Sequence, residues 1–172
     1  PIFGHLPLIH GEDGTKFSKR HGAPSLSSYK ELGYIPEALC NYLLRLGWSH
    51  GDDEFISQEQ AIEWFTPQNI QKSPARFDWK KLNHMNAHYL RALANDKLGS
   101  LLAPFVEQKI ERSLTTEETA LLTAALPGLK QRAETLVELA DNALFYLNTP
   151  TEVSPKGLKF LTEQNIIRVA DF

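Results

Sequence analysis

The residues best suited to chemistry lie in one glycine-containing stretch near the start of the chain, from His10 to Gly22. Two lysines, Lys16 and Lys19, stand three positions apart there, with the hydroxyl of Ser18 between them. Glycines let a loop adopt unusual backbone angles and approach a ligand closely. Lysine is a compact point charge that can follow a moving phosphate. The stretch therefore suits a polyphosphate whose charge grows during a reaction, and its composition fits a solvated basic loop equally well.

The glycine spacing differs from that of a Walker-type phosphate loop, which ends in Gly-Lys-Ser/Thr. The rest of the chain, which has to hold this stretch in place, is predicted to be helical. Pro36 suits a first helical position, and apolar residues follow it at helical spacing up to Gly47. We expect further helix starts at two capping boxes and at three single caps. The capping boxes are Ser57 with Gln60 and Thr115 with Glu118, and the single caps are Asp78, Asn86 and Asp96.

The remaining pattern predicts a helix ending near Pro127-Gly128, a long one over 129–147 and a final one from Ser154. We find no alternation of strands with helices, and the only strand candidate, 6–9, contains Pro7. The segment from Gly22 to Ser28 is expected to be a turn. The sequence thus predicts an all-α protein: a multi-helix bundle of two small helical subdomains with an irregular N-terminal arm.

Composition limits the class of protein. The chain has 172 residues, of which 42% are hydrophobic, so it can bury a sizeable core. Its single cysteine, Cys40, excludes an internal disulfide and is expected to be buried in a reducing compartment. His84 and His88 have a metal-compatible spacing without a third ligand nearby, so we expect no zinc site. No apolar run approaches the roughly 18 residues of a membrane span, so we expect no membrane association. We also expect a monomer in the cytoplasm.

Charge is unevenly distributed along the chain, whose formal net charge is −3. Between residues 72 and 109 the basic residues outnumber the acidic ones, whereas the flanking segments are acidic. A local basic stretch in an acidic protein can bind a phosphate backbone. Charge alone, however, favours a solvated helix face.

The segment Lys16-Phe-Ser-Lys-Arg20 resembles the Lys-Met-Ser-Lys-Ser signature of class I aminoacyl-tRNA synthetases. Its surroundings are similar to bacterial-type glutamyl-tRNA synthetase over about residues 3–93, and more thinly beyond. The matching segments are His5-Leu-Pro-Leu-Ile9, Gly11-Glu-Asp-Gly14, Lys19-Arg-His-Gly22, Tyr29, Gly33-Tyr-Ile-Pro-Glu-Ala-Leu39, Asn41-Tyr-Leu43, Leu46-Gly-Trp48, Gly51-Asp-Asp53, Lys72-Ser-Pro-Ala75 and Phe77-Asp78. Phe17 departs from the usual Met or Leu but keeps an apolar anchor.

The resemblance implies that ATP and glutamate form glutamyl-adenylate, and that the glutamyl group then passes to tRNA(Glu), and in some relatives to tRNA(Gln). It implies catalytic roles for Lys16 and Lys19 on the triphosphate. Ser18 would belong to the same ATP site, and the backbone near Leu8 and Ile9 would lie by the adenine. We expect Mg²⁺ to accompany ATP, although no carboxylate here is a clear ligand for it.

The resemblance also implies a domain organisation. Residues 1–24 would end the catalytic domain, 25–92 would form the stem-contact helical domain, and 93–172 would begin the anticodon-binding helical domain. The basic stretch then becomes the candidate tRNA contact. Its residues are Lys72, Arg76, Lys80, Lys81 and Arg91.

The His-Ile-Gly-His-like element of class I synthetases has no counterpart in this sequence, because Gly4-His5 lacks the preceding histidine. The glutamate-binding parallel-sheet domain has no counterpart either. We therefore expect a fragment that cannot make glutamyl-adenylate alone. Two alternatives remain: a stand-alone, non-catalytic helical tRNA-binding module, and an unrelated all-α interaction protein with a chance signature. The length of the matching run disfavours the second.

Overall fold

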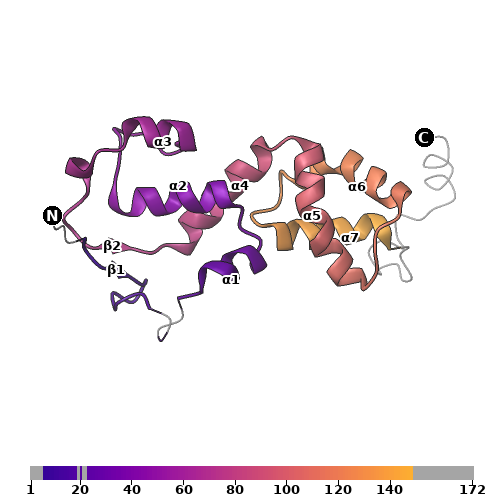
Figure 1. Cartoon of the computed structure of the whole chain (residues 1–172). Helices are drawn as coiled ribbons and strands as arrows, with labels where there is room; N and C mark the ends of the chain where they lie inside the picture. The colour runs from indigo at the N-terminus through magenta and orange to yellow at the C-terminus, as the bar shows by residue number, and fades with distance from the viewer. Residues whose placement is uncertain (1–5, 19, 21–22, 149–172) are drawn as a thin grey trace, which may run out of the picture.

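The computed structural model describes residues 6–18, 20 and 23–148, and within them the chain forms two helical lobes (Figure 1). The all-α prediction is confirmed, with a very short two-stranded sheet added to it. The elements of the first lobe are β1 (Ile9–His10), α1 (Leu26–Glu31), α2 (Pro36–Gly47), α3 (Gln58–Trp64), the 3-10 helix η2 (Pro67–Asn69), β2 (Ala75–Arg76) and α4 (Trp79–Ala92). Those of the second are α5 (Asn95–Ile110), α6 (Thr116–Leu129) and α7 (Leu136–Leu147).

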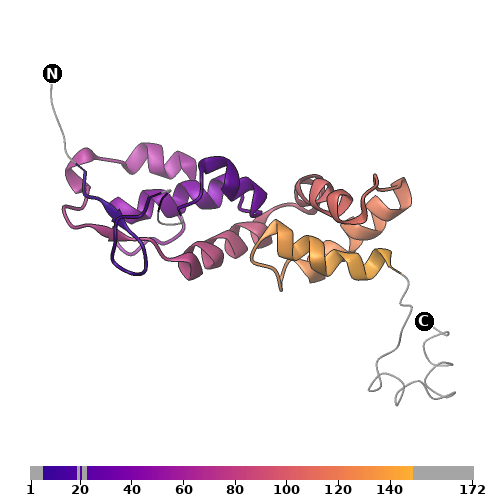
Figure 2. The ribbon, with the colours of Figure 1, turned by 90° about the horizontal axis from the view of Figure 1, so that it is seen from below.

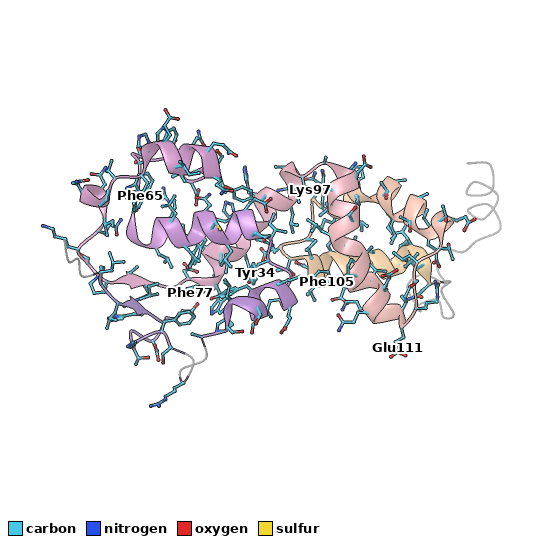
Figure 3. The ribbon with its side chains drawn as sticks, in the orientation of Figure 1. Tyr34, Phe65, Phe77, Lys97, Phe105 and Glu111 are labelled. Atoms are coloured by element: carbon cyan, nitrogen blue, oxygen red, sulfur yellow. The ribbon has the colours of Figure 1, made fainter. Side chains whose placement is uncertain are left out.

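The first lobe is built around α2 and α4, which pack against each other and bury an aromatic cluster. Tyr42, Leu82 and Met85 are almost fully buried there, and Phe77 joins them from the chain just before α4. Figure 3 shows Tyr34 and Phe77 in this lobe, on the side of α1 and the β strands. The cluster supplies the rigid base on which the N-terminal arm rests.

The second lobe is a three-helix arrangement in which α5, α6 and α7 all contact one another. Its core includes Leu98, Leu102, Val106, Leu126 and Leu139, each almost completely buried. The view from below in Figure 2 shows the same two lobes in line, with the end of α4 leading into the second. None of the described helices is long and apolar enough to cross a lipid bilayer.

Several predicted helix starts are confirmed. Pro36 occupies the first turn of α2. Ser57 and Thr115 form complete capping boxes at α3 and α6. Asp78 caps α4, because its carboxylate accepts a hydrogen bond of 3.1 Å from the Lys81 amide. These starts were predictable because a cap acts on backbone groups only two or three residues away.

The predicted helix start at Asn86 is wrong. Asn86 is fully buried inside α4, where its side chain bonds distant parts of the chain instead of the adjacent backbone. Asp96 is not a cap either, since α5 begins after Ala94 and Asp96 lies in the first helical turn. A carboxylate in the first turn still interacts favourably with the helix dipole.

Other boundaries also differ from the prediction. Helix α6 continues through Pro127 to Leu129, and α7 begins later than expected, where the Thr135 hydroxyl accepts from the Glu138 amide at 3.2 Å. The helix α1 replaces part of the expected turn, because Ser25 caps it through the Ser28 amide. The predicted helix from Ser154 lies outside the described residues.

The strand predicted over 6–9 is confirmed only at its last residue, Ile9. The strand β1 begins at Ile9, beyond Pro7, and pairs in parallel with β2, which the sequence did not predict. Two residues are too few for a periodic pattern, so only the pairing defines β2. The prediction that Cys40 is buried is wrong: Cys40 is exposed on α2, where it lines an open groove shared with Ile56 and Ser57.

Candidate nucleotide and tRNA site

The signature stretch forms a tight hairpin whose two arms are hydrogen bonded. The Phe17 amide donates to the Ile9 carbonyl at 2.9 Å, and the Gly11 amide donates to the Thr15 carbonyl at 2.9 Å. Gly14 closes the turn with a φ of 78°, a value that glycine adopts without strain. The Asp13 carboxylate accepts from both the amide and the hydroxyl of Thr15 at 2.9 Å. The hairpin therefore has a defined shape outside any helix.

Phe17 anchors this hairpin to the first lobe. Its ring stacks on Phe77 with the ring centroids 4.5 Å apart and the planes inclined by 19°. The apolar anchor predicted at this position is confirmed, since Phe17 packs against the aromatic cluster. The neighbouring Lys16 is exposed. The hairpin thus holds its backbone against the core while the ammonium of Lys16 stays available to an anion.

Three other residues predicted to bind ATP, Leu8, Ile9 and Ser18, lie on or beside this hairpin. Leu8 is exposed and Ile9 is half-buried on β1, so both are adjacent to the hairpin's first arm. Ser18 follows Phe17, and its carbonyl accepts from the Ala23 amide at 3.0 Å. Lys19 lies outside the described residues. The nucleotide-site roles of these residues stay predictions.

The two-stranded sheet brings a basic residue to the hairpin from more than sixty positions away. Ile9 pairs with Ala75 and His10 with Arg76, and the Phe77 amide donates to the His10 carbonyl at 2.8 Å. A Cβ placed on Gly14 would lie 3.9 Å from a terminal guanidinium nitrogen of Arg76. The structure therefore brings one predicted tRNA contact, Arg76, next to the signature hairpin.

Arg76 also lines a polar pocket of about 220 Å³ between α2, β2 and the start of α4. Arg45 and Lys81 line the same pocket, with Asp78 and the buried Tyr42 behind them. Three cations around one carboxylate make this pocket attractive to an anion. We call the surface formed by Arg45, Arg76 and Lys81 the basic pocket.

Arg45 was not predicted as a site residue. Its terminal guanidinium donates to the Asp53 carbonyl, while its Nε is buried and has no hydrogen-bond partner among the described residues. In the sequence it is a single arginine in an apolar helical run, which carries no functional signal. Only the pairing of β1 with β2, and of α2 with α4, shows that it shares a pocket with Arg76 and Lys81.

The remaining predicted contacts do not line this pocket. Lys80 is exposed in the first turn of α4, and Lys72 is exposed in the loop before β2. Arg91 lies in the last turn of α4, about 16 Å along the helix axis from Lys80. The predicted set therefore extends from the loop before β2 to the end of α4 and does not form a single cluster.

Tyr42 fixes the start of α4 beneath the basic pocket. Its hydroxyl donates to the Asp78 carbonyl at 3.0 Å and accepts from the Asp78 amide at 2.7 Å. Burial raises the pKa of Tyr42 to about 12, so the hydroxyl stays protonated at neutral pH. It acts as a structural donor that positions Asp78 and Lys81.

Metal binding has no obvious place in the described part of the chain. Residues 6–18, 20 and 23–148 contain no group of three or more His, Cys, Asp or Glu side chains arranged to hold an ion. His88 stacks on Phe55 with centroids 3.6 Å apart, which gives that ring a packing role.

Two family models match successive parts of the chain. A family model described as tRNA synthetases class I (E and Q), catalytic domain, matches residues 1–84. A model described as an anticodon binding domain matches residues 97–169. The helical lobes and the signature hairpin thus belong to a class I aminoacyl-tRNA synthetase, with part of a catalytic domain followed by an anticodon-binding domain.

The relatives narrow this class. The chain is 50% identical over 165 residues to glutamate–tRNA ligase 2 of Paramagnetospirillum magneticum, covering 95% of this chain and 35% of that protein. It is 52% identical over 163 residues to glutamate–tRNA ligase 2 of Zymomonas mobilis, covering 94% and 34%. The chain belongs to the glutamate–tRNA ligase family, as the signature and its surroundings predicted, and spans about a third of the length of these relatives.

Two solved structures of glutamate–tRNA ligases have a similar fold over most of this chain. A glutamate tRNA ligase from Elizabethkingia meningosepticum, crystallised in complex with its amino acid, superposes with a TM-score of 0.74 at 25% identity, covering 99% of this chain and 37% of that one. The glutamate–tRNA synthetase of Elizabethkingia anophelis gives a TM-score of 0.74 at 27% identity, covering 92% and 35%.

Proposed function

We propose that this chain is the part of a glutamate–tRNA ligase that holds the ATP triphosphate with its signature hairpin and binds tRNA with its helical lobes. The observation that supports this most directly is the hairpin itself. Phe17 anchors it to the first lobe, Lys16 next to it is exposed, and Arg76 of the basic pocket lies beside its turn. Phosphate-binding and RNA-binding cations are thereby held on one rigid base.

In the proposed reaction a glutamate carboxylate oxygen attacks the α-phosphorus of ATP. An oxygen–phosphorus bond forms, the bond to the pyrophosphate breaks, and glutamyl-adenylate results. A hydroxyl of the terminal adenosine of the tRNA then attacks the activated carbonyl and releases AMP. Lys16 and Lys19 would stabilise the charge that grows on the phosphate oxygens, and such stabilisation lowers the barrier more than it improves ATP binding. Any Mg²⁺ would be held chiefly by the triphosphate oxygens.

The role of Lys16 is tested in a glutamate–tRNA ligase that contains this chain and has the full length of the relatives. We expect Lys16→Ala to slow glutamate-dependent pyrophosphate exchange about 100-fold or more, with a much smaller change in the KM for ATP, because one transition-state donor is lost. Lys30→Ala, which removes an exposed lysine from α1, is the control and should have little effect. A change confined to KM would contradict the proposed role.

Isolated residues 1–172 are expected to be inactive in the same assay. With ATP, glutamate and tRNA present, the chain should give no pyrophosphate exchange above background, because it spans only a third of its active relatives. The full-length Zymomonas mobilis ligase serves as the positive control. Appreciable turnover by the isolated chain would refute this expectation, whereas tRNA binding without turnover would agree with a binding module supplied by a larger enzyme.

The tRNA surface is proposed to include Lys72, Arg76, Lys80, Lys81 and Arg91, and to be extended by Arg45 through the basic pocket. Arg and Lys contacts to a phosphate backbone position the RNA and weaken steeply with salt. The unpartnered Nε of Arg45 supports its inclusion, because a buried guanidinium donor is stabilised by an acceptor. We propose tRNA(Glu) as the partner; tRNA(Gln), a monomeric state and a cytoplasmic location are further proposals that rest on the family.

Salt dependence tests this surface. Replacing Lys80 and Lys81 by Ala should weaken binding of a tRNA(Glu) transcript and reduce the slope of log K against log salt by about one to two units, since each lost phosphate contact removes about one. The matched control replaces Lys109, whose ammonium pairs with Asp141 within the second lobe, together with the exposed Lys30 of α1. An unchanged slope in the Lys80/Lys81 variant would count against the assignment.

A further inference from the structure

A buried asparagine lies where the two lobes meet. Asn86 has no exposed surface, and its side chain bonds three peptide groups from two distant segments. Its carbonyl oxygen accepts from the Ile35 amide at 2.9 Å, and its amide nitrogen donates to the Glu134 carbonyl at 2.6 Å and, more weakly, to the Gly33 carbonyl at 3.5 Å. The turn before α2 belongs to the first lobe, and Glu134 precedes the first helical turn of α7 in the second.

The backbone approaches closely at the same place. The Leu136 amide donates to the Gly33 carbonyl at 2.9 Å. A Cβ on Gly33 would lie 2.7 Å from the Val137 nitrogen and 2.8 Å from the Leu136 nitrogen, and Gly33 has a φ of +83°. No side chain fits between the turn and the start of α7, so the two segments are in direct backbone contact.

Apolar packing continues across the junction. Ile35 and Ala38 of the first lobe and Leu90 near the end of α4 belong to the same buried cluster as the core of α5, α6 and α7. Hydrophobic contact is favourable but has no preferred direction. Hydrogen bonds are directional, so those that cross the junction can select one orientation of the lobes. Asn86 makes one of these bonds, to the Glu134 carbonyl, and its bonds to Ile35 and Gly33 hold in place the turn that receives the Leu136 amide.

We propose that Asn86 is a positioning residue that fixes the angle between the two lobes, so that both present their RNA-binding surfaces to one tRNA at the same time. The effect on tRNA binding rests on the proposed function, whereas the effect of Asn86 on the angle between the lobes can be tested without RNA. Two linked binding units reinforce each other only when their geometry allows simultaneous contact. Asparagine is suited to this place because its side chain offers one acceptor and two donors.

The structural part is tested by a distance measurement on the 172-residue chain. Its single thiol, Cys40, is exposed on α2, and Ala124 is exposed on α6, so Ala124→Cys gives one label site in each lobe. Spin–spin distances should be narrowly distributed in the chain with native Asn86. In Asn86→Asp the distribution should broaden or shift, because a carboxylate faces the Gly33 and Glu134 carbonyls with nothing to donate.

Asn83→Asp is the matched control, since it introduces the same charge one turn earlier on α4 and leaves an acceptor for the Tyr34 hydroxyl. It should leave the distance distribution unchanged. A distribution in Asn86→Asp as narrow as in the control would overturn the proposal. If circular dichroism shows that Asn86→Asp is unfolded, the spin–spin distance distribution is measured in Asn86→Ala instead. Unfolding of both Asn86 variants would show that the residue only holds the core together, and would also overturn it.

The functional part compares a whole tRNA(Glu) transcript with its isolated anticodon stem–loop. Asn86→Asp should weaken binding of the whole tRNA about tenfold or more and leave binding of the stem–loop unchanged, because each lobe still binds its own part of the RNA. An equal loss for both RNAs would indicate general damage and contradict positioning. If the native chain bound no tRNA at all, the proposed function would fail while the distance result would still decide the role of Asn86 in orienting the lobes.

Discussion

Phe17 shows how one side chain connects the signature to the core. Its ring stacks on Phe77 within the aromatic cluster. The contact fixes the backbone next to Lys16 while leaving the lysine exposed. A stacked aromatic pair contributes beyond the area that it buries.

We therefore expect Phe17→Ala to lower the free energy of unfolding by about 1–2 kcal/mol, since a half-buried ring loses its packing. Urea denaturation measures this change. Phe17→Leu is the comparison and should keep most of the stability, because it retains an apolar anchor. Equal stability of Phe17→Ala and the native chain would mean that the stacking does not hold the hairpin.

At the scale of the element, the start of α6 depends on a charged capping box. The Glu118 carboxylate accepts from the Thr115 amide at 3.0 Å and from the two terminal nitrogens of Arg112 at 2.8 and 2.7 Å. The hydrogen bonds from Arg112, reinforced by the Thr115 amide, lower the pKa of Glu118 to about 2. The carboxylate is therefore favoured over the protonated acid in the folded state.

This lowered pKa predicts a pH dependence. In the unfolded chain Glu118 titrates near its ordinary value of about 4.3. The stability it contributes is thus fully present above that value and is lost as the pH falls from about 5 towards 2. Thermal melts should show the native chain more stable than Glu118→Gln at pH 7, with the difference shrinking by pH 2.

Glutamine can keep the capping-box bond to the Thr115 amide, whereas it removes the carboxylate that accepts from both terminal nitrogens of Arg112. Glu117→Gln, at the exposed neighbouring position, is the control. A difference between the native chain and Glu118→Gln that stays constant from pH 7 to pH 2 would rule out the charge as its cause.

The junction between the lobes carries the strictest steric requirement among the described glycines. Gly33→Ala would place a methyl group 2.7 Å from a backbone nitrogen, at a φ of +83° that alanine disfavours. We expect this substitution to cost at least about 2 kcal/mol in unfolding free energy, because backbone strain and overpacking act together. Chemical denaturation of the 172-residue chain measures it.

Gly128→Ala is the matched control for this prediction. Gly128 lies inside α6, and a Cβ there would meet nothing within 4 Å. Alanine is the better helix former by about 1 kcal/mol, so this variant should be as stable as the native chain or slightly more stable. Similar stabilities for Gly33→Ala and Gly128→Ala would show that the junction can adjust and is not rigid.

The sequence predicted those features that depend on neighbouring residues. Pro36, Ser57 and Thr115 marked helix starts correctly because a first turn or a cap is decided within one helical turn. The signature around Lys16 indicated the family for a similar reason, since its chemistry is carried by residue types at short, fixed spacing. The helical class followed from apolar periodicity over many turns.

Features that join residues distant in the sequence could be seen only in the fold. Asn86 has the side chain of a typical cap, yet it bonds Ile35 and Glu134, about fifty positions away on either side, because burial removes water as a competing partner. The strand β2 exists only because β1 pairs with it, and Arg45 shares a pocket with Arg76 and Lys81 only through that packing. Local sequence therefore determined the helices and the reactive signature, whereas long-range hydrogen bonds and packing determined how the two lobes and their cations are placed together.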